Sequence, residues 1–148
     1  MIRAFREKDL PAVMQIWLDS NLKAHHFIPR EYWTAHYAAV KEMLPQADVY
    51  VHEDDDTRQI TGFIGLTDDY IAGIFVKGEV QSKGIGKRLL NYVKKLKPAL
   101  SLSVYQKNVR AVSFYQREQF SIHSENMDND TNEKEFIMNW KHDSSVDR

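Results

Sequence analysis

Residues 70–96 read YIAGIFVKGEVQSKGIGKRLLNYVKKL, and this stretch decides the fold. Its first part, residues 70–76, is an almost continuous apolar run that predicts a strand buried on both faces. Its last part, residues 85–96, has apolar side chains every three or four positions and predicts an amphipathic helix. Gly84 and Gly86 lie at the junction between the two. The stretch therefore predicts a buried strand, a glycine loop and a helix in succession.

The sequence on either side predicts further helices and strands. Upstream, we expect a helix from Leu10, with Asp9 as its N-cap, and then a loop at residues 21–29. The other expected elements are a helix ended by Pro45, strands at 49–52, 60–66 and 100–105, a helix at 109–118, and strands near 120–124 and 136–140. Two helices, a meander of strands and then alternating strands and helices indicate an α/β protein with a mixed sheet.

The composition excludes several classes of protein. The chain has 148 residues, 43% of them hydrophobic, and a formal net charge of -1, which suits one compact domain and argues against a sequence-independent nucleic-acid binder. It has no cysteine, which excludes disulfides, a thiol nucleophile and a thiolate metal site. No apolar stretch approaches the ~20 residues of a membrane span, and the N-terminus lacks signal-peptide features. We expect a soluble cytoplasmic protein with no membrane or nucleic-acid partner, one domain at 1–141 and a polar tail at 142–148.

The glycine loop has the properties of a phosphate site. Gly84 and Gly86 let the backbone approach a ligand closely, and the first turn of a helix offers unpaired N–H groups and a positive dipole. Lys83, Lys87 and Arg88 add mobile positive charge beside it. A tight turn with a solvated basic face is the alternative interpretation. The spacing matches neither the Walker A motif nor a dinucleotide-binding motif, which leaves a pyrophosphate held at the helix N-terminus.

A second motif, NVRAVSFY at residues 108–115, opens the next helix. Asn108 can cap that helix and also donate to a ligand amide. Phe114 and Tyr115 are about 100° apart on a helix, so we expect one in the core and the other at a cleft. A tyrosine hydroxyl has a pKa of about 10, which suits protonation of a departing thiolate. The alternative is that Tyr115 simply packs, with its hydroxyl satisfied locally.

Together the two motifs resemble the GCN5-related N-acetyltransferase (GNAT) family. The matching residues are Gln81, Gly84 and Gly86 in the first motif, and Asn108, Ala111, Phe114, Tyr115 and Phe120 in the second. The resemblance covers nearly the whole chain, from Ile2 to Trp140, and is greatest for small bacterial stand-alone members of the family. Gln119 stands where the family has a glycine at the helix exit, and we expect an altered turn geometry there.

The resemblance implies a central, mostly antiparallel sheet flanked by helices, with two strands splayed apart at the cofactor site. It implies acetyl-CoA as cofactor, coenzyme A as product, no metal, and direct transfer of the acetyl group to a primary amine. The pyrophosphate would bind the backbone of Gln81, Ser82, Lys83, Gly84, Ile85, Gly86 and Lys87. The pantetheine arm would lie along Phe75 and Val76 and contact Asn108, and Tyr115 would protonate the leaving thiolate.

The acceptor side is less defined. The amine could belong to a protein lysine, a protein N-terminus or a small molecule, and the strand at 70–76 has no acid to serve as the base. His25, Phe27 and Tyr70 are candidates to line the acceptor site, although a histidine in an aromatic loop can equally be structural. The protein is expected to be a monomer or homodimer. The competing hypotheses are a non-catalytic acyl-CoA-binding or sensory module and, third, a nucleotide-binding domain.

Overall fold

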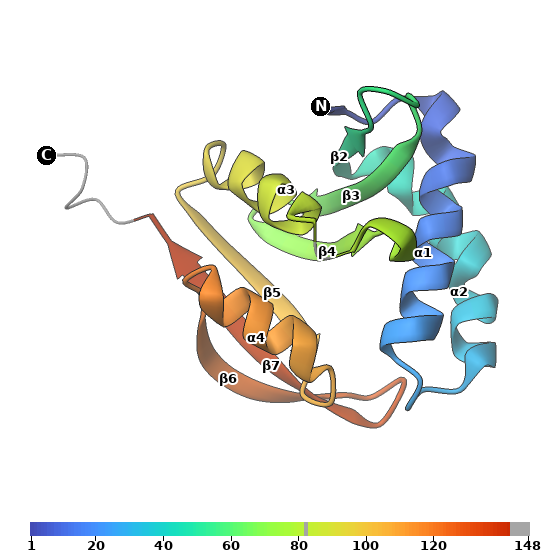
Figure 1. Cartoon of the computed structure of the whole chain (residues 1–148). Coiled ribbons are helices and arrows are strands. Elements are labelled where there is room, and N and C mark those ends of the chain that lie inside the picture. The colour runs from blue at the N-terminus through green and yellow to red at the C-terminus, as the bar shows by residue number, and fades with distance from the viewer. Residues whose placement is uncertain (82, 143–148) are drawn as a thin grey trace, which may run out of the picture.

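The computed structural model describes residues 1–81 and 83–142. One seven-stranded sheet has the strand order β1-β2-β3-β4-β5-β7-β6 (Figure 1). Within it β4 and β5 are parallel, and every other neighbouring pair is antiparallel. The strands are β1 (Ile2–Ala4), β2 (Asp48–Glu53), β3 (Ile60–Thr67), β4 (Tyr70–Val76), β5 (Ala99–Tyr105), β6 (Ser121–Asp128) and β7 (Glu133–Lys141). The expected mixed, mostly antiparallel sheet is confirmed.

Helices cover both faces of this sheet. They are α1 (Leu10–Ala24), α2 (Arg30–Met43), α3 (Ile85–Lys94) and α4 (Val109–Arg117). The buried side chains form two clusters, one beneath α1 and α2 and the other beneath α3 and α4. Strand β3 contributes Phe63 to the first cluster and Ile64 to the second, as expected when successive side chains point to opposite faces. The sheet therefore separates two apolar cores, and β3 is buried on both sides.

Strand β4 is less buried than its apolar sequence predicts. Ile71 is fully buried, whereas Tyr70 and Ala72 are exposed and the remaining residues are half-buried. In the described structure β4 pairs with β5 at two positions only, Tyr70 with Ser101 and Ile71 with Leu102. The two strands then diverge, so the C-terminal half of β4 has no neighbouring strand on that side. The prediction of burial on both faces is wrong, and the missing neighbour accounts only for the half-buried residues 73–76, because Tyr70 is exposed although it pairs with Ser101.

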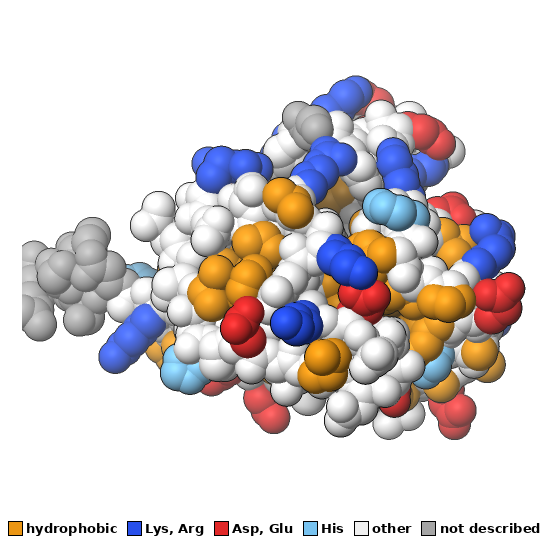
Figure 2. All heavy atoms as spheres, turned by 90° about the horizontal axis from the view of Figure 1, so that it is seen from below, with side chains coloured by type: hydrophobic (Ala, Val, Ile, Leu, Met, Phe, Trp, Pro, Cys, Tyr) orange, Lys and Arg blue, Asp and Glu red, His pale blue; other side chains and the backbone are white. Residues whose placement is uncertain are grey.

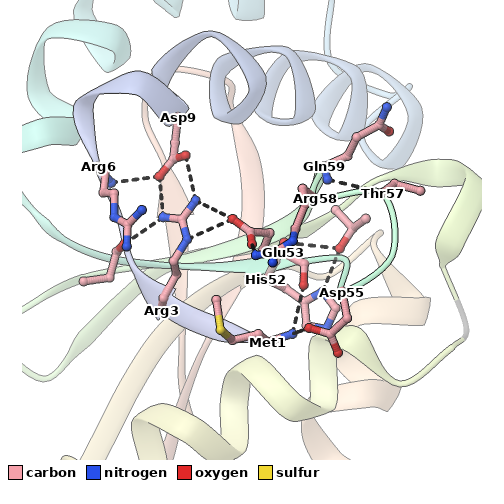
Figure 3. Close-up of polar contacts among 12 residues, drawn as sticks. Met1, Arg3, Arg6, Asp9, His52, Glu53, Asp55, Thr57, Arg58 and Gln59 are labelled. Carbon is pink, nitrogen blue, oxygen red and sulfur yellow. Dashed lines mark hydrogen bonds and ion pairs between the residues drawn. The ribbon is translucent and has the colours of Figure 1, made fainter.

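The start of α1 also differs from the prediction. Asp9 precedes the helix, but its side chain makes no capping bond to α1. It is buried and accepts two hydrogen bonds from the Arg3 guanidinium, at 2.8 and 2.9 Å. Glu53 accepts from the same guanidinium at 2.9 Å, so one arginine joins β1, the start of α1 and β2 (Figure 3). Strand β1 was not predicted.

The other element boundaries follow the predictions with local shifts. Helix α1 continues to Ala24, into the segment expected to be a loop. Helix α3 ends at Lys94, and Leu96, expected on its apolar face, is half exposed. No helix in the described ranges is long and apolar enough to cross a membrane. Residues 143–148, most of the expected polar tail, lie outside the described residues.

Candidate active site

A cleft of about 920 Å³ opens where β4 and β5 diverge. Its walls are the end of α1 with the following loop, the end of β4, the start of α3, and α4. The predicted site residues that line it are His25, Phe75, Val76, Gln81, Gly84, Ile85, Gly86, Lys87, Asn108 and Tyr115. The described cleft lining does not include three other predicted residues, Phe27, Tyr70 and Lys83. Ser82, also predicted, lies outside the described residues.

The cleft is strongly basic. Its charged lining comprises one carboxylate, Glu118, and five cationic side chains: Lys23, Lys87, Lys107, Arg110 and Arg117. Seen from below, the molecule has a recess with Lys and Arg side chains around it (Figure 2). A concave surface lined with one sign of charge concentrates counter-ions, so this cleft attracts an anionic ligand.

The two glycines of the loop serve different purposes. Gly84 is the N-cap of α3 and has φ +82°, a left-handed conformation that a residue with a Cβ adopts at a cost. The space beside it is open, because an added Cβ would meet no heavy atom closer than Arg88 Nη2 at 3.9 Å. An added Cβ on Gly86 would lie 3.6 Å from the Phe114 ring and 3.8 Å from Val76. Gly86 therefore keeps the space between these two cleft walls free.

Two polar side chains hold the loop in place. Gln81 donates from Nε2 to the Val76 carbonyl at 3.1 Å and accepts at Oε1 from Arg110 at 3.2 Å. Arg88 donates from Nη2 to the Lys83 carbonyl at 3.0 Å, and its Nη1 lies 3.4 Å from His52 Nε2 on β2. Arg88 therefore contacts the loop backbone and β2. No sequence signal points to His52, because it is 36 residues away from Arg88.

Tyr115 lies deep in the cleft. Its ring is buried against Phe114 and Phe120. Tyr115 belongs to the buried core cluster and Phe114 is only partly buried at the cleft, as the predicted division requires, although Tyr115 also lines the cleft. Burial, with a smaller effect of the nearby Tyr70, raises the pKa of the Tyr115 hydroxyl above its ordinary value. Among the described residues this hydroxyl has no hydrogen-bond partner. It is therefore a protonated donor at neutral pH that no described group satisfies locally.

Asn108 and His25 meet across the cleft. Asn108 caps α4 as predicted, since its Oδ1 accepts from the Ala111 backbone N–H at 3.3 Å. Its Nδ2 lies 3.2 Å from His25 Nε2. Burial lowers the pKa of His25 to about 4, so its imidazole is neutral at pH 7. A neutral ring whose Nε2 already accepts a hydrogen bond is a poor general base.

An acidic group, Asp128, Asp130 and Glu135, lies near the aromatic loop after α1, which contains His25 and Phe27. The Tyr105 ring contacts those of His25 and Phe27, at 5.0 and 5.7 Å between centroids. The Tyr105 hydroxyl donates to Asp128 at 2.7 Å, at the end of β6. Asp128, with Asp130 and Glu135, also raises the pKa of Tyr32 on α2, after the larger effect of burial. These carboxylates are close together in the sequence, at residues 128–135, but the sequence does not show that the fold brings them to Tyr105 and Tyr32.

Known proteins resemble this chain along most of its length. A family model described as an acetyltransferase (GNAT) domain matches residues 45–122. The chain is 35% identical over 142 residues to the peptidyl-lysine N-acetyltransferase YiaC of Escherichia coli (strain K12), covering 95% of this chain and 96% of YiaC. It is 30% identical over 121 residues to the peptidyl-lysine N-acetyltransferase YjaB of Salmonella typhimurium (strain LT2), covering 82% of this chain and 83% of YjaB.

The fold is similar to a solved structure of the same kind. The solution structure of apo-form YjaB from Escherichia coli superposes with a TM-score of 0.84 and 25% sequence identity, covering 95% of this chain and 96% of that one. The similarity therefore extends over nearly the whole of both chains.

Proposed function

Because the chain belongs to the GNAT family of N-acetyltransferases, we propose that it transfers the acetyl group of acetyl-CoA to the ε-amine of lysine side chains in proteins. The observation that carries this proposal is the 35% identity, over 95% of the chain, to a relative named a peptidyl-lysine N-acetyltransferase. A second relative, 30% identical, carries the same name. A protein N-terminus or a small amine is the competing acceptor.

The cleft fits the cofactor that this activity needs. Its basic lining suits the phosphates of coenzyme A. Because Gly86 has no side chain, the pantetheine arm of the cofactor has room between Val76 and Phe114. In the proposal, backbone N–H groups from Gln81 to Lys87, Ser82 and Lys83 included, bind the pyrophosphate at the start of α3. Phe75 and Val76 line the path of the pantetheine arm, and Asn108 donates to it.

Tyr115 is the proposed general acid. When bound, acetyl-CoA supplies a thioester, whose C–S bond breaks as the amine nitrogen forms the new C–N bond. Tyr115 donates its phenolic proton to the departing sulfur and recovers one when the amine proton is lost. Two observations support this role: the buried hydroxyl keeps its proton at neutral pH, and no described group engages it. The same burial also raises the pKa of a thiol beside Tyr115. The pKa difference between the Tyr115 hydroxyl and the leaving thiol is therefore smaller than the shift of Tyr115 alone implies.

The acidic group beyond the aromatic loop supports a cationic acceptor. A lysine side chain approaches as an ammonium ion, and carboxylates such as Asp128 and Glu135 favour its arrival. Phe27 contacts the rings of His25 and Tyr105, and the Tyr105 hydroxyl reaches Asp128 of this acidic group. The proposal keeps Phe27, His25 and the exposed Tyr70 as the acceptor-side wall. The proton of the ammonium must leave before attack, and the proposal assigns no residue to that step.

The acceptor is tested with a set of matched amines. Coenzyme A release is measured with acetyl-CoA and a peptide that has a blocked N-terminus and one internal lysine. The comparisons are the same peptide with arginine for lysine, a lysine-free peptide with a free N-terminus, and spermidine. We expect turnover with the lysine peptide alone. Turnover confined to the free N-terminus or to spermidine would overturn the lysine assignment, and no turnover with any amine would favour the non-catalytic binding module.

The role of Tyr115 is tested by removing one oxygen atom. Tyr115→Phe keeps the ring packing and should lower kcat by at least about tenfold, since general acid catalysis is typically worth ~10²–10⁴-fold. The dissociation constant of acetyl-CoA should stay within about twofold of the wild-type value. Tyr92→Phe, on α3 and outside the cleft lining, is the matched control and should leave kcat unchanged. Wild-type kcat in Tyr115→Phe, where chemistry limits the rate, would remove Tyr115 from the mechanism.

A further inference from the structure

A chain of three side chains crosses the cleft from α1 to α4. His25, in the loop after α1, lies between two amides: its Nδ1 is 3.0 Å from Asn21 Oδ1, and its Nε2 is 3.2 Å from Asn108 Nδ2. Asn21 is a buried residue of α1, and Asn108 is the N-cap of α4, 83 residues after His25. The chain therefore joins two elements that stand on opposite sides of the opening between β4 and β5.

Backbone contacts identify which end of each amide faces His25. Asn21 donates from Nδ2 to the Trp17 carbonyl at 2.9 Å, so its oxygen is the atom that faces His25. Asn108 accepts at Oδ1 from the Ala111 N–H, so its nitrogen faces His25. An oxygen on one side and an NH₂ group on the other require His25 to donate from Nδ1 and to accept at Nε2. His25 is thereby held as the neutral Nδ1–H tautomer.

The surroundings of the ring restrict its movement. His25 stacks on Trp33, with centroids 5.3 Å apart and 25° between the planes. The rings of Phe27 and Tyr105 meet it edge-on at 5.7 and 5.0 Å. A ring enclosed by aromatic contacts on several sides has few alternative rotamers, so its two nitrogens stay aimed at the two amides.

We propose that His25 is a positioning residue that orients the Asn108 amide for the cofactor arm. The Asn108 amide has one oxygen and two N–H groups, and the oxygen accepts from Ala111 while one N–H is given to His25. The remaining N–H is the group left for a carbonyl of the pantetheine arm. Without His25 the amide loses the partner that holds its nitrogen toward the cleft. The inference rests on the proposed function in one respect, that acetyl-CoA occupies this cleft.

Two substitutions of His25 separate positioning from packing. His25→Phe keeps the aromatic contacts and removes both hydrogen bonds. We expect the dissociation constant of coenzyme A, measured by calorimetry, to rise about fivefold, the worth of one ordinary hydrogen bond. His25→Gln places an amide oxygen near the position of Nε2 and should return the constant to within about twofold of wild type. His36→Phe is the matched control and should leave the constant unchanged, because His36 is a half-buried histidine that contacts the Tyr32 ring and lies outside the described cleft lining.

Asn108→Ala supplies the decisive comparison. If His25 acts through Asn108, adding His25→Phe to Asn108→Ala should change the dissociation constant by less than twofold. An undiminished fivefold effect in that background, or no recovery in His25→Gln, would overturn the positioning role.

Nitrogen NMR of the wild-type imidazole at pH 7 gives a test without ligand: the Nδ1–H tautomer is expected, and the Nε2–H tautomer would contradict the network. If the wild-type protein bound no coenzyme A at all, the proposed function itself would fail; a wild type that binds while His25→Phe binds equally well would overturn this inference alone.

Discussion

Gly84 and Gly86 are two residues apart but are glycines for different physical reasons. Gly84 has φ +82°, so a Cβ there costs free energy through the backbone although the space around it is open. Gly86 lies in the first turn of α3, where an added Cβ would make ordinary contacts with Phe114 and Val76. The first glycine is required by conformation and the second by the shape of the cleft.

Alanine substitutions should therefore change stability in opposite directions. Gly84→Ala forces a left-handed alanine, which costs about 1 kcal/mol, and should lower Tm by about 3 °C. Gly86→Ala replaces a helical glycine, which gains up to about 1 kcal/mol, and should raise Tm by a similar amount. Thermal denaturation followed by circular dichroism measures both. A Tm change of the same sign in the two variants would contradict this division of roles.

The charge of Asp9 links folding to pH. The Arg3 guanidinium, which donates two hydrogen bonds to it, holds the pKa of Asp9 below its ordinary value of 3.8 despite burial (Figure 3). Because the folded state binds the proton less well than the unfolded state, the stabilisation is complete above about pH 4. It is lost as the pH falls through the lower, folded-state pKa.

Asp9→Asn should thus destabilise the protein in a pH-dependent way. At pH 7 we expect a loss of about 2–3 kcal/mol in the free energy of unfolding, because Arg3 is nearly buried and keeps only Glu53 as an ionised partner. The difference from wild type should shrink below pH 4, because Asp9 is protonated first in the unfolded state and then, at its lower folded-state pKa, in the folded state. Denaturant titrations between pH 3 and pH 7 measure this, with the exposed Asp56→Asn as control. A constant difference down to pH 3 would show that the charge of Asp9 is not the cause.

At the scale of elements, the sequence predicted where strands and helices lie better than it predicted which strands pair with each other. Residues 70–76 form a strand with the predicted limits, yet its apolar run gave no warning that β5 leaves it after Ile71. A periodic pattern reports which faces of a strand are apolar, but it carries no information on which strand pairs with it or for how long. The opening of the cleft was anticipated only from the family resemblance.

The same limit applies to the candidate site. The two motifs at 81–87 and 108–115 lie at strand-to-helix junctions on the same cleft, which is why residues of both appear together in its lining. The contacts that hold them in place were not predicted, because Asn108 meets His25 across 83 residues and Arg88 meets His52 across 36. Strand β1 is three residues long, too short for any periodicity to be detected.

The exit of α4 shows how an element keeps its geometry when its usual residue is missing. Gln119 has φ +75°, the left-handed conformation that a glycine adopts without strain, so the altered turn expected from the sequence is not found. The backbone bonds of the exit are made, including Phe120 N–H to the Tyr115 carbonyl at 2.9 Å. The turn therefore keeps the geometry that a glycine would allow, and the backbone of Gln119 is strained.

Gln119→Gly should relieve that cost. We expect stabilisation of about 1 kcal/mol, which corresponds to a Tm increase of about 3 °C, with coenzyme A affinity unchanged because Gln119 is not among the described cleft residues. Differential scanning calorimetry measures the gain. Gln116→Gly, in the helical part of α4, is the control and should lower Tm. A decrease in Tm for Gln119→Gly would mean that side-chain contacts of Gln119 outweigh its backbone strain.

At the scale of the whole molecule, the sheet consists of two parts with a short junction. Strands β1 to β4 form one part, strands β5 to β7 the other, and the described backbone pairing between them is limited to the two positions at the start of β4. Side-chain bonds span the rest of the opening, among them His25 with Asn108 and Gln81 with Arg110. A ligand in the cleft would contact both parts at once, which makes the junction the place where binding should alter local stability.

Hydrogen exchange with mass spectrometry tests this directly. The backbone of β4 after Ile71 has no described pairing toward β5, and the first N–H groups of α3 have no acceptor within their own helix. Peptides that cover residues 72–88 and 106–112 should exchange faster than those of β3 in the free protein.

Acetyl-CoA at a hundred times its dissociation constant should slow this exchange by up to about 100-fold where opening requires ligand release, whereas ATP and NAD should do so much less. Strand β3, buried on both faces, serves as the internal control and should not change. Equal protection by ATP would favour a nucleotide-binding domain, and protection confined to β6 and β7 would place the ligand outside the cleft between the two parts of the sheet.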